Sequence, residues 1–415
     1  MLVKIVSKFF DIENSHKIDV AVKNGRYASL DKIFDLKPQD LVDEVDRSGL
    51  RGKGGGGAPA GAKWKLMQGY DDRKKYLVVN ADESEPGTFK DRQIMEFDPH
   101  LLIEGMIDTA YAIEANNAYI YIRGEYLFWF HRLNEAIKEA YEKGYLGKDI
   151  KGSGFDLDIT VHRGAGAYIC GEKSALLESL EGKRGHPRLK PHQKECEWFF
   201  GEPTLVNNVE TIASVPFIIN EGADAYRSYG TQKSPGNMLF GMSGHINNPG
   251  IYEAPYGTSM KEYLQKIGGG VKNGKKLKAI IPGGSSCAIL KADEIEDVTL
   301  DYESLRGHGS SLGTGGMIVM DESVFIPEVT KNLLEFYHHE SCGQCTPCRE
   351  GVGWCDRLLM RILSGEGSKK DIDTILDVSD LLNGKTICVF APAVASVLVS
   401  HIKKFPDEFY SLCKD

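Results

Sequence analysis

The sequence predicts an α/β protein in which a three-layer domain with a largely parallel sheet precedes a small α+β module and a helical end. Three observations carry this prediction. Short apolar segments alternate with segments of helical periodicity through the first half of the chain. The composition shifts near residue 235 to strand-like runs between Pro/Gly turns. From Glu328 onward the pattern is helical.

The first half supplies the elements of the predicted sheet in order. Residues 1 to about 48 read as a charged, helical lead-in, because apolar residues recur there at helical spacing. Strands are expected at 75–80, 118–123 and 155–162. Helices are expected at 99–116 and 130–143. Ligands of such sheets bind at the carboxyl ends of strands, so the turns that follow these strands are candidate sites.

The second half predicts two further units. Short strands around 238–245, 248–252 and 279–284, with one helix at 259–267, indicate an α+β module of about 80 residues. The remainder, from Glu328, is expected to be helical to the end.

Composition excludes several classes of protein. The chain has 415 residues, which is too long for one core and predicts two to four domains. Its net charge of −9 argues against a nucleic-acid surface. The first eight residues are too short and too charged for a signal peptide, and no apolar run approaches the ~20 residues that span a bilayer. We therefore expect a cytoplasmic protein, and any membrane role must come through a partner.

The stretch from Arg51 to Trp64 is the most informative loop. It holds four consecutive glycines, with Lys53 and Lys63 close by. Glycine loses the most backbone entropy on folding, so such a run suits a loop whose N–H groups surround an anion, usually a phosphate. A flexible linker is the alternative, and the run matches neither the Walker nor the dinucleotide fingerprint.

Polar turns follow two of the predicted strands. The acidic turn 80–85 places three carboxylates at a strand end, where they either hold the hydroxyls of a polyol such as a ribityl chain or form a solvated turn. The turn 163–172 combines glycines with Tyr168. Asn207 and Asn208 are adjacent amides that read a ring edge or cap a helix.

Nine cysteines occur, and four of them have ligand-like spacing. Cys342, Cys345 and Cys348 recur every three residues, and Cys388 follows at a distance. A tight run of this kind plus a remote fourth thiol is typical of an iron–sulfur cluster. Zinc, with His338 or His339 as a further ligand, is the second interpretation, and inert buried thiols are the third.

Taken together, these blocks resemble the flavin-bearing, NADH-oxidising subunit of respiratory complex I, the 51-kDa or F subunit. The resemblance covers nearly the whole chain in order, from the Gly-rich loop through 80–92, 119–126, 164–172, 178–191 and 207–211 to the cysteine block. It implies a Rossmann-like FMN domain, a ubiquitin-like β-grasp module and a helical bundle. The expected bounds are 1–72 for a helical segment with the Gly-rich loop, 73–235 for the FMN domain, 236–327 for the β-grasp module and 328–415 for the cluster domain.

The resemblance also implies the cofactors and their residues. FMN would meet the Gly-rich loop and the Asn207–Asn208 region with its phosphate. The residues implied to bind the cofactor are Gly52, Lys53, Gly54, Gly55, Lys63, Asn80, Asp82, Glu83, Tyr168, Gly171, Glu172, Asn207, Asn208 and Thr211. Glu85 would lie near the nicotinamide and is the candidate catalytic residue. Cys342, Cys345, Cys348 and Cys388 would ligate a [4Fe–4S] cluster.

The implied activity is hydride transfer from NAD(H) or NADP(H) to flavin, followed by one-electron transfer to the cluster. The implied partners are a thioredoxin-like [2Fe–2S] subunit and a large iron–sulfur subunit, with no nucleic acid. Through them the chain would sit in the peripheral arm of a membrane complex, on the inner face of the cell membrane.

The nicotinamide site departs from the family pattern. Ala58 stands where the family has Phe, family aromatics near Leu66 and Gln193 are absent, and Lys173 replaces a Glu beside the adenosine ribose. The aromatics clamp the dinucleotide, and a base in place of the acid would accept a 2′-phosphate. We therefore expect FMN and the cluster to be retained but NADH to bind poorly. The alternatives are a flavoprotein linked to NADPH or a protein donor, and a structural assembly subunit with a vestigial flavin site.

Overall fold

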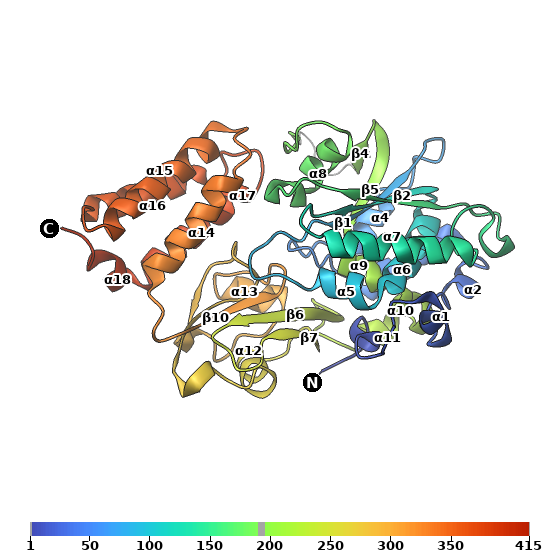
Figure 1. Ribbon diagram of the computed structural model, residues 1–415, viewed down its shortest axis with the longest axis horizontal. Helices are drawn as coiled ribbons and strands as arrows, with labels where there is room; N and C mark the ends of the chain where they lie inside the picture. Colours follow the sequence, from blue (N-terminus) through green and yellow to red (C-terminus); the bar gives the residue numbers. More distant parts are fainter. Residues whose placement is uncertain (1, 190–195, 415) are drawn as a thin grey trace.

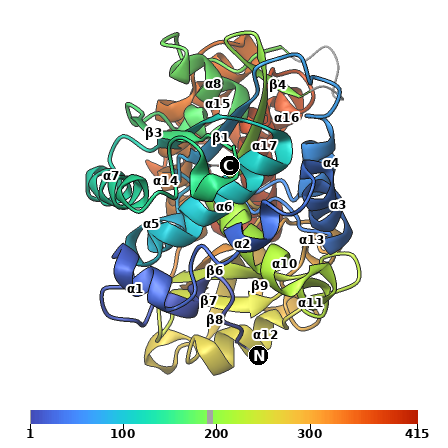
Figure 2. The ribbon, with the colours of Figure 1, turned by 90° about the vertical axis from the view of Figure 1, so that its right-hand side faces the viewer.

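Three units make up the chain in the computed structural model, which describes residues 2–189 and 196–414. An α/β unit holds the first sheet, a smaller α+β unit follows it, and helices form the rest (Figure 1). Seen from the side, in Figure 2, the C-terminal helices lie behind the first unit. The predicted fold class is confirmed. No helix among the described residues is long and apolar enough to cross a membrane.

The first sheet has five strands in the order β3-β2-β1-β5-β4. All neighbours are parallel except β4 and β5. The strands are β1 (Tyr76–Ala81), β2 (Asn117–Ile122), β3 (Asp158–Arg163), β4 (Glu197–Phe199) and β5 (Glu202–Asn208). Strand β1 is central, and its register pairs Asn80 with Asn208. The carboxyl ends of the four parallel strands therefore meet at one edge, where ligands of such sheets bind.

Helices cover both faces of this sheet. They are α1 (Ile18–Lys23), α2 (Leu30–Ile33), α3 (Pro38–Ser48), α4 (Ala60–Lys65), α5 (Asp91–Phe97), α6 (Pro99–Ile113), α7 (Leu127–Glu142), α8 (Lys173–Leu180), α9 (Val209–Ala213), α10 (Val215–Glu221) and α11 (Ala223–Arg227). Helix α6 starts where the Asp98 carboxylate accepts a hydrogen bond from the Leu101 N–H. It is buried almost throughout, and one core runs from Ile5 to Leu239.

The second sheet has the order β7-β6-β10-β8-β9, with β6 and β10 parallel and the other neighbours antiparallel. Its elements are β6 (Asn237–Gly244), β7 (Gly250–Pro255), α12 (Met260–Glu262), the π-helical segment Tyr263–Ile267, β8 (Leu277–Ile281), β9 (Leu290–Lys291), α13 (Tyr302–Gly307) and β10 (Gly316–Asp321). The helical unit follows with α14 (Ile326–Glu340), α15 (Thr346–Leu363), α16 (Lys369–Leu382), α17 (Phe390–Lys404) and α18 (Pro406–Tyr410).

The expected elements agree closely with the observed ones. The three strands predicted in the first half are β1, β2 and β3, and the two helices are α6 and α7. Strands β4, β5, β9 and β10 were not predicted from the pattern. Strand β5 contains Pro203 and ends in two asparagines, which is why periodicity alone does not reveal it.

Close packing of α6 on α9 makes a testable prediction. A Cβ on Gly105 would lie 2.3 Å from the Ile212 carbonyl oxygen, which is backbone and cannot move aside cheaply. Gly105→Ala should therefore destabilise the protein by about 1–3 kcal/mol, measured by urea or thermal unfolding. Gly307→Ala is the matched control, because a Cβ there meets nothing within 4 Å. Equal stability of the two variants would show that the helices separate without cost.

Candidate functional site

A cavity of about 550 Å³ lies at the carboxyl edge of the first sheet and is walled by all three units. Its lining includes ten of the fifteen residues expected at the cofactor and nicotinamide: Gly54, Gly55, Asn80, Asp82, Glu83, Glu85, Tyr168, Gly171, Glu172 and Asn208. The second unit adds Ser286, Ser311, Gly313 and Thr314, and the helical unit adds residues 388–390 and 392–393. The site therefore depends on how the three units pack together.

The Gly-rich loop forms one end of this cavity. A Cβ on Gly54 would lie 3.1 Å from the Asn208 Cβ, and Gly55 has a φ of +117°. Gly57 has a φ of +63°, and a Cβ there would lie 2.4 Å from the ring of Tyr302 on α13. The loop thus needs glycine both for its conformation and for its close contact with the second unit. A chain this close to the cavity presents backbone amides to an anion.

The side chains of Lys53 and Lys63, the two lysines of the loop region, contact other parts of the protein. Lys53 is fully buried, and its Nζ lies 2.8 Å from the Ser214 Oγ and 3.3 Å from Glu210 Oε1. Lys63 donates to the Val206 carbonyl oxygen at 2.9 Å. Neither lysine is among the residues that line the cavity, and neither are Gly52, Asn207 and Thr211. The glycine backbone of the loop is the part of it that borders the cavity.

Asp82 offers the clearest sign of a ligand in the cavity. Its Oδ1 is buried and has no hydrogen-bond partner among the residues that the structure describes. Burial raises the pKa of Asp82 to about 7, partly offset by Arg123. Beside it, Asn80 Nδ2 donates to the Gly171 carbonyl oxygen at 2.9 Å. An orphaned acceptor at a cavity wall fits a hydroxyl of a bound polyol, so the residues present fit the ribityl chain of FMN.

Glu83 lines the cavity and also has a structural role. Its carboxylate accepts hydrogen bonds from the N–H groups of Asp91 (2.7 Å) and Arg92 (3.2 Å) at the start of α5. The Tyr126 hydroxyl donates to it as well, at 3.2 Å. Burial and the nearby Asp91 charge raise the pKa of Glu83 to about 7. This carboxylate therefore anchors α5 under the acidic turn.

Glu85 accepts hydrogen bonds from three groups that belong to two units. The Tyr168 hydroxyl donates to Oε2 at 2.5 Å. From the second unit, the Ser286 N–H donates to Oε1 at 2.7 Å, and the Ser285 hydroxyl reaches the same oxygen at 3.2 Å. Ser285 in turn lies 2.7 Å from the hydroxyl of Tyr337 on α14. A carboxylate fixed by this many donors keeps one orientation at the cavity wall.

Gly284 makes this approach possible. Its φ is +99°, and a Cβ there would lie 2.6 Å from the Glu85 Cγ. Burial, and then the Glu85 charge, hold the pKa of Tyr168 well above its usual value. Tyr168 therefore remains a hydrogen-bond donor to Glu85 at any working pH.

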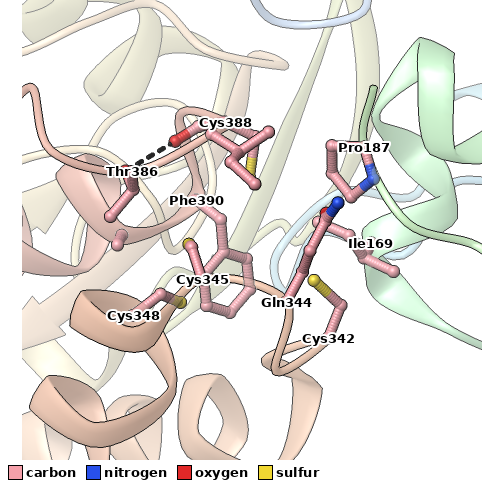
Figure 3. Close-up of a pocket in the computed structure, with 11 residues that line it drawn as sticks. Ile169, Pro187, Cys342, Gln344, Cys345, Cys348, Thr386, Cys388 and Phe390 are labelled. Atoms are coloured by element: carbon pink, nitrogen blue, oxygen red, sulfur yellow. Dashed lines mark hydrogen bonds between the residues drawn. The ribbon is translucent and has the colours of Figure 1, made fainter. Parts of the chain in front are cut away.

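The four expected cluster cysteines line a second, smaller cavity (Figure 3). Cys342 precedes α15, Cys345 caps it, Cys348 lies in its first turn, and Cys388 faces them from the loop before α17. All four cysteines border the same space. A four-iron cluster suits four thiols around one space, because each thiolate binds its own iron.

Burial raises the pKa of Cys348 to about 12 and that of Cys388 to about 11. Thiolates are the ligand form, so the positive charge of bound iron has to offset this burial. The two cavities also share a wall, formed by Ile169, Cys388 and Phe390. The cysteine site and the flavin-type cavity are therefore direct neighbours.

Two of the positions where this chain lacks an aromatic residue of the family lie on the surface. Ala58 and Leu66 are exposed, and Gln193 falls outside the described residues. Lys173 lies 2.6 Å from Glu197 Oε1 on β4. The cation that would accept a 2′-phosphate is thus already paired with a carboxylate.

Sequence reasoning missed several residues of the site. Asp91 lines the cavity and accepts from Asn208 Nδ2 at 2.6 Å, while Lys90 bridges Asp91 and Glu210 at 2.7 and 2.9 Å. Ser285 and Tyr337 were also missed. The turn Pro282–Gly284 after β8 could have pointed to the two serines, because glycines after a strand allow another part of the chain or a ligand to approach the backbone closely. No local sequence pattern identifies Tyr337 as a residue of the site.

Three family models match successive parts of the chain. Residues 45–217 match the Nuo51 FMN-binding domain, and residues 238–319 match an SLBB domain. Residues 328–412 match the iron–sulfur binding region of NADH-ubiquinone oxidoreductase-F.

Curated relatives and solved structures agree with these matches. The chain is 48% identical to the NADH-quinone oxidoreductase F subunit of Mycobacterium tuberculosis (strain H37Rv), over 98% of this chain and 93% of the relative. It is 47% identical to the protein of the same name in Streptomyces coelicolor, over 99% and 91%. An NAD⁺-reducing [NiFe]-hydrogenase in the H₂-reduced state has a chain of the same fold, with a TM-score of 0.87 and 30% identity, covering 100% of this chain and 67% of that one.

The raised pKa of Asp82 predicts a pH-dependent effect on stability. A carboxyl whose pKa rises on folding stabilises the fold below its unfolded pKa, and that contribution is lost as pH rises through about 7. Asp82→Asn cannot ionise, so the variant does not lose stability in this way as pH rises. In flavin-free protein, the variant's unfolding temperature should exceed the wild type's at about pH 8 by about 2 °C or more, and the gain should shrink toward about pH 4.

Differential scanning fluorimetry across this pH range makes the measurement. Asp377→Asn on the exposed face of α16 is the control and should show no such trend. A gain for Asp82→Asn that stays constant with pH would contradict the prediction.

Proposed function

This chain belongs to the family of NADH-quinone oxidoreductase F subunits, and from that premise we propose that electrons from NADH enter a larger oxidoreductase through it. It is a flavoprotein oxidoreductase subunit with an FMN-binding domain and a [4Fe–4S] binding region. The observation that carries the proposal is the wall shared by the two cavities, because it joins a flavin-sized site directly to four cysteines.

When bound, FMN supplies exchange between two-electron and one-electron chemistry, and the cluster supplies one-electron transfer. The residues of the chain bind these groups and orient them. Amides of Gly54 and Gly55 would meet the phosphate, and Asp82 with Asn80 would hold ribityl hydroxyls. Glu85, fixed by Tyr168 and the serines, would orient the nicotinamide. The described part of the second and helical units closes the cavity on its other sides.

The alternative functions are not favoured by the comparisons. Full-length relatives are NADH-quinone oxidoreductase subunits, and both cofactor regions are matched. Pairing of Lys173 with Glu197 also weakens the argument for NADPH, since the carboxylate beside the lysine would repel a 2′-phosphate. An assembly subunit with a vestigial flavin site has no observation in its favour, because the cavity walls are intact.

We further propose the partners and location typical of such a subunit. They are a thioredoxin-like [2Fe–2S] subunit, a large iron–sulfur subunit, and a place in the peripheral arm of a membrane complex. The support is family membership together with the hydrogenase-type structural neighbour.

Anaerobic titration of the purified chain with NADH tests the proposed function. The flavin absorbance should bleach, and a reduced-cluster signal should then appear by electron paramagnetic resonance. Cys388→Ser should lose iron and the cluster signal, while NADH still bleaches the flavin. Cys355→Ser is the control, because Cys355 is a buried thiol on α15 that does not line the cysteine cavity. Loss of iron from both variants, or from neither, would contradict the ligand assignment.

Exposed Ala58 makes a second prediction about NADH. Stacking of one aromatic ring is worth about 0.5–1.5 kcal/mol, which corresponds to about 2- to 12-fold in affinity. Ala58→Phe should therefore lower the KM for NADH several-fold with little change in kcat, in steady-state assays with ferricyanide. Ala62→Phe, exposed on α4 in the same segment, is the control. An unchanged KM in Ala58→Phe would show that residue 58 does not face the dinucleotide.

A further inference from the structure

The four cysteines of the cluster site differ in how far the protein encloses them. Cys348 is buried, with 6% of its surface exposed, whereas Cys342, Cys345 and Cys388 are partly exposed. The rest of the cavity wall is mostly apolar and consists of Ile169, Pro187, Ile387, Phe390 and Ala391, with Gln344 and Thr386 as its other polar members. Of the four sulfurs, that of Cys348 therefore depends most on the protein for a polar contact.

A side-chain hydroxyl meets this buried sulfur. Ser341 Oγ lies 3.3 Å from Cys348 Sγ. Ser341 ends α14, where its N–H donates to the Tyr337 carbonyl oxygen at 3.1 Å. The end of one long helix thus fixes the backbone that carries the hydroxyl, and the first turn of another carries the sulfur. A thiolate sulfur has no proton to give, so in a cluster ligand the hydroxyl is the donor of this pair.

A second hydroxyl in the cysteine cavity is used differently. Thr386 lines the cavity, but its Oγ1 donates to the Cys388 carbonyl oxygen at 3.0 Å (Figure 3). One hydroxyl of this region is therefore directed at a cysteine sulfur, and the other at a backbone oxygen. The two residues form a matched pair, because both bring a hydroxyl to the site and only that of Ser341 reaches a ligand atom.

We propose that the Ser341 hydroxyl donates a hydrogen bond to the Cys348 thiolate and thereby raises the reduction potential of the cluster. This rests on the proposed function, because it takes the four cysteines as cluster ligands. Reduction adds one negative charge to the cluster and its thiolates, and a donor aimed at a sulfur stabilises the more negative state more. The apolar cavity wall strengthens this hydrogen bond. Ser341 thus makes the cluster a better acceptor for electrons from the neighbouring flavin-type cavity.

A redox titration of the purified chain, followed by electron paramagnetic resonance of the reduced cluster, tests this role. Dithionite supplies one electron to each cluster through mediator dyes, so neither NADH nor the flavin takes part. Ser341→Ala should lower the midpoint potential. At a fixed ambient potential, the ratio of reduced to oxidised cluster should fall about tenfold, which corresponds to about 59 mV for a one-electron couple.

Two isosteric variants separate the hydroxyl from the shape of the side chain. Ser341→Thr keeps the hydroxyl and should titrate like the wild type, whereas Ser341→Val should fall as Ser341→Ala does. Ser341 also borders a polar cavity of about 480 Å³, which leaves room for the added methyl groups. The bulk of Val keeps water from taking the place of the hydroxyl. If Ser341→Ala binds too little iron to titrate, the Thr and Val variants give the same comparison.

Thr386→Val is the control for the second hydroxyl and should leave the midpoint potential unchanged. Equal midpoints for Ser341→Thr and Ser341→Val, with iron content intact, would overturn the proposal. A fall in Thr386→Val as large as that in Ser341→Val would overturn it too, because the polarity of the wall would then set the potential. A wild-type chain that binds no iron would instead contradict the ligand assignment, so failure of the proposed function is seen separately.

Discussion

The packing of the three units around the site depends on the hydrogen bonds that the Glu85 carboxylate accepts. This carboxylate leaves the turn after the central strand and accepts hydrogen bonds from Tyr168, Ser285 and Ser286. These donors belong to two different units, and Ser285 is tied to Tyr337 in the third. A half-buried carboxylate with several charge-assisted bonds is expensive to leave unpaired, so the packing of the units and the orientation of Glu85 determine each other.

This junction explains how the cavities are ordered. Because the second unit must reach Glu85, it closes the flavin-type cavity on one side, and α14 follows with the cysteine loop at its end. Ile169 and Phe390 then separate the two cavities by a single layer of side chains. The cysteines lie beyond that layer. The flavin-type cavity and the cysteine site are therefore in direct contact, and short-range electron transfer requires such contact.

Much of this was predictable from the sequence, for local reasons. Strands β1 to β3 are short apolar runs bounded by turns, and the cysteine spacing is a property of one loop. The acidic turn and the Gly-rich loop were identified because unusual residue types stand at strand ends or in a row.

The rest depends on contacts between residues far apart in sequence. Ser285 lies 200 residues from Glu85, and no periodicity marks it or Tyr337. Lys53 and Lys63 depend on the fold in the same way. Their positive charge beside a phosphate-type loop predicts an anion, and in the structure Lys53 pairs with Glu210, which only the fold brings near it. Charge in a sequence shows that a partner is needed, not which partner it is.

The most direct measurement is a double-mutant cycle on the rate at which NADH reduces the flavin. Tyr168→Phe and Ser285→Ala each remove one donor to Glu85, from different units. If both act by orienting the same carboxylate, their effects on the stopped-flow rate will be coupled, and the double variant will lose less than the sum of the two in free energy. Strictly additive losses would contradict the account, because they would mean that the two hydroxyls act on the site independently.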